Sequence, residues 1–186
     1  MTQDAKQKQI TEPQFVTTPD LDLIEMLASD AKMVLHVALK LFGAQSGWQE
    51  KSGMYLCVAD HKTGLPLAVV PIGQVPVERA EKYARLSQEK ALRLAQHPEH
   101  SSSWESRNQL KDEWGGAVRV GVFIISISGL PELGDEAVAL EVAWPRDTEA
   151  ALELIAEIAE KSNNPYRENL SKAVREERAY QEHAGT

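Results

Sequence analysis

The apolar run Ala117–Ile127 constrains the fold of this chain more than any other segment. Valine, isoleucine and phenylalanine dominate it, and polar residues do not alternate with them as they do in a half-exposed strand. Such a run predicts central strands that are covered on both faces. Gly115-Gly116 precedes it and Ser128–Pro131 follows it, and these residue types are typical of turns. The run is too short to span a bilayer, so it predicts a sheet inside a globular domain.

A second pair of strands is predicted at Met54–Asp60 and Leu65–Val70, joined by turn residues at His61–Gly64. Pro66 has no backbone N–H to donate, so its strand is expected at an edge of the sheet. Helical spacing of apolar side chains predicts helices at about 18–42, 77–96, 135–144 and 148–161, and a charged last helix after residue 165. Between residues 97 and 113 we expect a polar loop with a short helix near Trp104.

One face of the predicted helix 77–96 carries only small side chains. They are Ala80, Ala84, Ser87, Ala91 and Ala95. Small side chains let a helix axis approach its neighbour closely. The helix can use this face to lie tightly on its own sheet, or to contact the same helix of a second subunit.

The charge balance disfavours a nucleic-acid partner. The 186 residues carry a formal net charge of −8, which repels a phosphate backbone. Cys57 is the single cysteine, so no internal disulfide forms, and the polar start Met1–Pro13 has no apolar segment like that of a signal peptide. We therefore expect a cytoplasmic protein with no membrane partner. The domain is expected at residues 18–145, with a flexible tail at 1–17 and a C-terminal helical extension at 146–186.

Three stretches resemble the GlcG/HbpS/PduO-C-terminal family, also called DUF336. They are the hairpin Val58–Ala68, the helix segment Leu86–Ala91 with its Lys-Ala pair, and Gly115-Gly116 followed by Ile125–Gly129 and Asp135–Ala137. The resemblance implies an α/β (α+β) fold with a profilin-like antiparallel sheet flanked by helices. It also implies a homo-oligomer and, for some members, haem binding. The family has a hairpin with a polar turn where this chain has 117–127, so that turn is expected to be shortened or lost.

The best candidate for a ligand site is the turn at Ser128-Gly129 with the acids Asp135 and Glu136 at the predicted start of a helix. Together with the family's positions, the candidate ligand-binding residues are Lys90, Gly115, Gly116, Ser128, Gly129, Asp135 and Glu136. Backbone N–H groups beside a helix N-terminus can hold an anion. The alternative is purely structural: Gly129 permits the turn, and the two acids stabilise the helix.

Histidine and cysteine offer weaker candidates. His97 and His100 have a spacing compatible with metal binding, but a zinc site needs more ligands than these two, so a solvated loop is favoured and no metal is predicted. His97 or His61 can offer an axial nitrogen to haem. Cys57 lies within a predicted strand, where a buried, inert thiol is favoured over a nucleophile.

Two hypotheses for function follow. The first is a non-catalytic small-ligand-binding or sensing module that acts as an oligomer, with an unknown cofactor that could be haem. The second is a structural or assembly protein whose small-residue helix and C-terminal helices contact other subunits without a ligand. An enzyme ranks third, because the sequence shows no base positioned beside a nucleophile.

Overall fold

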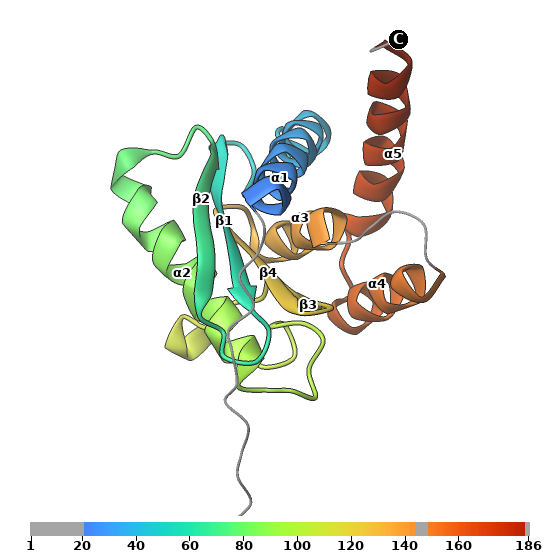
Figure 1. Cartoon of the computed structure of the whole chain (residues 1–186). Coiled ribbons are helices and arrows are strands. Elements are labelled where there is room, and N and C mark those ends of the chain that lie inside the picture. Colours follow the sequence, from blue (N-terminus) through green and yellow to red (C-terminus); the bar gives the residue numbers. More distant parts are fainter. Residues whose placement is uncertain (1–20, 144–148, 185–186) are drawn as a thin grey trace, which may run out of the picture.

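A computed structural model describes residues 21–143 and 149–184 (Figure 1). Four strands form one antiparallel sheet in the order β2-β1-β4-β3. The strands are β1 Gly53–Asp60, β2 Pro66–Gly73, β3 Ala117–Val120 and β4 Phe123–Ser128. The helices are α1 Leu21–Phe42, α2 Val77–Ala95, the short 3₁₀ helix η1 Gln109–Lys111, α3 Glu132–Ala143, α4 Glu149–Ser162 and α5 Arg167–Ala184. The predicted α+β class, an antiparallel sheet flanked by helices, is confirmed.

The sheet is built from two hairpins. In the first, β2 pairs only with β1 and forms an edge, as Pro66 predicted. In the second, Val120 pairs with Phe123, so the run that looked continuous contains a turn of two residues. Gly121, the first of these two residues, has a φ of +51°, which a glycine adopts at little cost. The turn is therefore shortened rather than lost.

Helices cover both faces of the sheet, and the side chains of β1 alternate between them. Met54, Leu56 and Val58 belong to the large core that includes α1 and α3, whereas Cys57 and Ala59 pack with side chains of α2. Ser87 and Ala91 on the small-residue face of α2 are fully buried. That face lies on the helix's own sheet, the first of the two arrangements expected for it.

The helical extension contributes to the same core. Ile155 and Ile158 of α4 and Leu170 and Val174 of α5 are buried in the cluster that holds α1 and α3. The predicted junction near residue 145, the tail at 1–17 and the expected helix start at 18–20 lie outside the described residues. None of the helices in the described ranges has the length and apolar character needed to cross a membrane.

Two local predictions were wrong. Helix α3 begins at Glu132 and not at Asp135, because Pro131 suits the start of a helix and its carbonyl already accepts the Asp135 N–H at 2.8 Å. The short helix expected near Trp104 forms instead at Gln109–Lys111, where the Asn108 side chain accepts the N–H of Leu110.

Candidate functional site

A buried ion pair joins α2 to α3. The ammonium group of Lys90 donates to a carboxylate oxygen of Asp135 and to the carbonyl oxygen of Ile127, each at 2.8 Å. The two side chains are only 1% and 4% exposed. Water is therefore excluded from both charges, and each is compensated mainly by the other.

Asp135 also fixes the turn that connects β4 to α3. Its second carboxylate oxygen accepts the backbone N–H of Leu130 at 2.9 Å. Burial raises the pKa of Asp135 from 3.8 to about 6, and the neighbouring Lys90 cation limits this rise. Loss of the Lys90–Asp135 ion pair would therefore also disturb the turn at Ser128–Leu130, which Asp135 holds through the Leu130 N–H.

Two glycines let the backbone pack closely at this site, Gly116 against the ion pair and Gly129 against β1. Gly116 has a φ of +114°, and a Cβ atom there would lie 2.7 Å from the Asp135 Cβ and 3.0 Å from the Lys90 Nζ. Gly129 has a φ of +146°, and a Cβ atom there would lie 2.7 Å from the Gly53 carbonyl oxygen. Neither position accepts a side chain without displacement of the site. The N–H of the preceding Gly115 donates to Glu132 at 2.7 Å.

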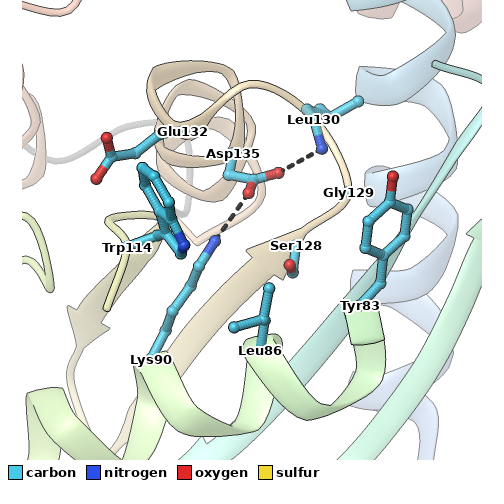
Figure 2. Close-up of a pocket in the computed structure, with 9 residues that line it drawn as sticks. All are labelled: Tyr83, Leu86, Lys90, Trp114, Ser128, Gly129, Leu130, Glu132 and Asp135. Atoms are coloured by element: carbon cyan, nitrogen blue, oxygen red, sulfur yellow. Dashed lines mark hydrogen bonds and ion pairs between the residues drawn. The ribbon is translucent and has the colours of Figure 1, made fainter. Parts of the chain in front are cut away.

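A pocket of about 220 Å³ opens beside this ion pair (Figure 2). Its lining residues are Tyr83, Leu86, Lys90, Trp114, Ser128, Gly129, Leu130, Glu132 and Asp135. The rings of Tyr83 and Trp114 stand on opposite sides of it, and the ammonium of Lys90 points toward Asp135 (Figure 2). The pocket therefore combines a mostly apolar wall with a few polar groups, as binding sites for small molecules do.

Two polar groups in this pocket keep unused hydrogen-bonding capacity. A lysine ammonium has three N–H donors, and among the described residues Lys90 uses two of them. The Ser128 hydroxyl makes no hydrogen bond to any described residue, although the residue is only 2% exposed. A ligand in the pocket can thus meet one free N–H of Lys90 and the hydroxyl of Ser128.

The Trp114 wall is held in place by an arginine of α2. Arg93 donates to the carbonyl oxygens of Ser103 and Trp114 and to the hydroxyl of Ser106. The indole N–H of Trp114 donates to Asp112 at 2.6 Å. The loop before β3 is thereby fixed against α2, and the indole ring faces the pocket with its polar atom already satisfied.

The structure brings together most, but not all, of the residues predicted for the site. Lys90, Ser128, Gly129 and Asp135 line the pocket, and Gly115-Gly116 forms the backbone beside it. The expected anion site of backbone N–H groups at the start of α3 is not found among these residues, because the Leu130 N–H is taken by the Asp135 carboxylate.

Glu136 belongs to a different cluster. Its carboxylate accepts the hydroxyls of Ser102 and Ser162 and the side-chain amide of Asn164 at 3.1 Å. Because Asp135 and Glu136 are neighbours on a helix, their side chains point in directions about 100° apart. Burial raises the pKa of Glu136, and the three donors oppose that rise. This carboxylate fastens the loop before β3, α3 and the end of α4 to one another.

The sequence analysis missed five lining residues, and one pattern could have found two of them. Tyr83 and Leu86 precede Lys90 by seven and four positions, so all three share a face of α2. Trp114, Leu130 and Glu132 reach the pocket only through the packing of distant segments.

The remaining candidates lie elsewhere. Cys57 is buried, and burial raises the pKa of its thiol to about 12, so it is not a nucleophile at neutral pH. His61 lies in the turn after β1, where its ring contacts the carbonyl oxygen of Val122 at 3.0 Å. His97 and His100 stack on each other after the end of α2, with ring centres 4.7 Å apart.

Haem, which the family resemblance implies, does not fit the pocket. A volume of about 220 Å³ lies below the ~300–1,000 Å³ of pockets that enclose drug-sized molecules, and a porphyrin is larger than most of these. Among the nine lining residues there is no histidine, cysteine or methionine, and Tyr83 is the only side chain of a type that binds haem iron. No role of haem is derived for this site.

Comparisons with known proteins gave one structural neighbour. No protein-family model matches the chain, and no curated protein matches it. The fold is similar to the crystal structure of Klebsiella pneumoniae protein ORFY, which is described as a DUF336 protein. The match has 17% sequence identity and a TM-score of 0.45, and it covers 79% of this chain and 97% of that chain. The description names the family that the motifs resemble, and at this TM-score nothing about function transfers from it.

Proposed function

We propose that this protein is a non-catalytic binding module that takes one small molecule in the pocket beside Lys90. The observation that supports this is the pair of unused polar groups in a mostly apolar pocket, the third N–H of Lys90 and the hydroxyl of Ser128. A buried polar group without a partner costs free energy, so a ligand oxygen that supplies the missing partner is bound favourably.

Size and charge narrow the class of ligand. An apolar cavity of about 150 Å³ takes up benzene, so a pocket of about 220 Å³ admits a single substituted ring. The pocket holds the Lys90 cation together with the carboxylates of Asp135 and Glu132. Such a balance disfavours an added anion. The ligand is therefore an uncharged single-ring compound with a hydroxyl or carbonyl oxygen directed at Lys90.

Binding is proposed here rather than a reaction because the polar groups lack a catalytic arrangement. The ammonium of Lys90 is already paired with Asp135, and Ser128 has no base within hydrogen-bonding distance among the described residues. A serine nucleophile requires such a base.

The experiment uses two probes of matched size. Benzyl alcohol and benzoate are titrated into ¹⁵N-labelled protein, and the signals of the Gly129 amide and the Trp114 indole are followed. Benzyl alcohol is expected to shift both signals in a saturable way, and benzoate is expected to bind more weakly. Ser128→Ala should weaken the binding of benzyl alcohol about three- to tenfold, the effect of one hydrogen bond.

Ser29→Ala serves as a control for this variant, because Ser29 lies on α1 outside the pocket. It should leave the affinity unchanged. Native mass spectrometry of protein purified from its host would also detect a retained molecule. If neither probe shifts a signal of the pocket and no small molecule is retained, the proposal is wrong.

Assembly into a homo-oligomer stays a prediction, as does a cytoplasmic location. The middle of the small-residue face of α2, at Ser87 and Ala91, is buried in its own subunit, so it is not available for subunit contacts. The same native mass spectra report the number of subunits.

A further inference from the structure

A second group of side chains with ligand chemistry lies after the end of α2, away from the pocket. His97, Glu99 and His100 each offer one ligand atom, and these three atoms lie within 4.8 Å of one another. The sequence analysis weighed the two histidines alone and favoured a solvated loop. The structure adds the Glu99 carboxylate between them, which supplies the third ligand that the histidines lacked.

Two of the distances in this cluster are close to those around a single metal ion. Nδ1 of His97 lies 3.3 Å and Nε2 of His100 lies 3.5 Å from the same carboxylate oxygen of Glu99. Tetrahedral zinc with bonds of about 2.0–2.1 Å places its ligand atoms about 3.3–3.4 Å apart. The side chain of His97 is 41% exposed, so its ring has room to turn out of the stack with His100 toward an ion. Nδ1 of His100 is buried without a partner, which leaves Nε2 as the accessible nitrogen.

The backbone under the cluster is already fixed. Arg119 of β3 donates to the carbonyl oxygens of His97 and His100, at 3.1 and 3.3 Å, and the His100 N–H donates to the His97 carbonyl oxygen at 3.0 Å. An ion therefore does not have to order the turn when it binds. The cluster also follows the C-terminal end of α2, where the helix dipole favours a cation.

We propose that His97, Glu99 and His100 form a surface site for one divalent transition-metal ion of the zinc type. Two imidazoles and a carboxylate are ligands that zinc, copper and nickel accept, whereas calcium and magnesium prefer oxygen ligands alone. Three protein ligands leave a coordination position for water, as in open zinc sites. Arg119 is a second cation near the proposed ion, but its N–H groups point at carbonyl oxygens. The Glu99 carboxylate offsets part of the charge of the ion.

Calorimetric titration of Zn²⁺ into the full chain, without an affinity tag, tests the site at pH 7.5. One equivalent is expected to bind, and Mg²⁺ is expected not to compete. His97→Ala, His100→Ala and Glu99→Gln should each weaken binding by at least about tenfold.

His36→Ala is the matched control, since His36 is an exposed histidine of α1. It should leave the zinc affinity unchanged. Circular dichroism shows whether each variant keeps its fold, and the absorption of Co²⁺ provides a second reading of nitrogen coordination. The proposal is overturned if Zn²⁺ does not saturate the protein, or if folded His97→Ala and His100→Ala bind it as tightly as the unchanged chain.

Discussion

Replacing Lys90 with methionine removes the ammonium group and keeps an unbranched side chain of similar length. In this variant the Asp135 carboxyl must be protonated to stay buried. Holding a carboxyl of ordinary pKa 3.8 protonated at pH 7 costs about 4 kcal/mol. The unchanged protein already bears about 3 kcal/mol of this cost, because burial raises the pKa of Asp135 from 3.8 to about 6. Lys90→Met therefore adds only the remaining difference of about 1 kcal/mol. The lost hydrogen bonds of Lys90 add roughly 1–3 kcal/mol, so Lys90→Met should lower the free energy of unfolding by about 2–4 kcal/mol.

The same pKa gives this effect a pH dependence. The pKa of Asp135 is higher in the folded than in the unfolded protein, so folding binds a proton and the contribution of this group to stability rises as the pH falls from 7 toward 4. At pH 5 the carboxyl is mostly protonated with or without Lys90. The loss caused by Lys90→Met should therefore shrink by about 1 kcal/mol between pH 7 and pH 5.

A double variant separates charge from packing. Asp135→Asn keeps an acceptor for the Leu130 N–H and removes the negative charge, so Lys90→Met/Asp135→Asn should be more stable than Lys90→Met at pH 7 by about 1 kcal/mol or more. Guanidinium unfolding followed by tryptophan fluorescence measures each value at both pH values. Lys32→Met, at an exposed lysine of α1, should change little. Equal stability of Lys90→Met and the unchanged chain at pH 7, or a loss that grows at pH 5, would refute the reasoning.

Three further outcomes are expected. Gly129→Ala should cost at least about 3 kcal/mol in the same unfolding assay, because its Cβ would contact the Gly53 backbone, whereas Gly121→Ala, with open space around its Cβ, should cost only about 1–2 kcal/mol. Glu136→Ala should destabilise the protein by about 3 kcal/mol and Glu136→Gln by less, since glutamine still accepts a hydrogen bond; equal losses would contradict this. Haem added in equimolar amount should give no shifted Soret band, and a saturable band would show that the pocket adapts to a porphyrin.

Local chemistry predicted much of the fold. The turn at His61–Gly64 and the edge position of Pro66 depend on residues close in sequence, and both were predicted correctly. The turn at Gly121-Val122 was harder, because its two residues lie between apolar residues and only Gly121 is of a type that marks a turn. The start of α3 was misplaced because two acids indicated a helix N-terminus, whereas the helix begins one turn earlier, after Pro131.

For the site, the sequence pointed to residues that lie close together in the structure, and their role in ligand binding stays a prediction. Lys90, Ser128 and Asp135 were chosen from turn chemistry and family motifs, and they do line one pocket. The ion pair between Lys90 and Asp135 spans 45 positions, and no local pattern encodes it. Glu136 was assigned to the same site because it is adjacent to Asp135, but its partners Ser162 and Asn164 come from the extension.

The loop before β3 is fastened by its carbonyl groups as well as by side chains such as Ser102 and Ser103. Arg93 and Arg119 bind the carbonyl oxygens of Ser103, Trp114, His97 and His100, and every residue type carries that acceptor. These contacts do not depend on the side chains of the four residues, whereas lysine cannot replace either arginine, because it lacks the fork of donors that reaches several carbonyls at once. Natural variation and laboratory selection can thus change side chains of the pocket wall and of the turn at His97–His100 while the fold stays the same. A library that randomises the other loop positions and keeps both arginines, Ser102, Ser103 and Gly116 should yield folded proteins with new ligand preferences.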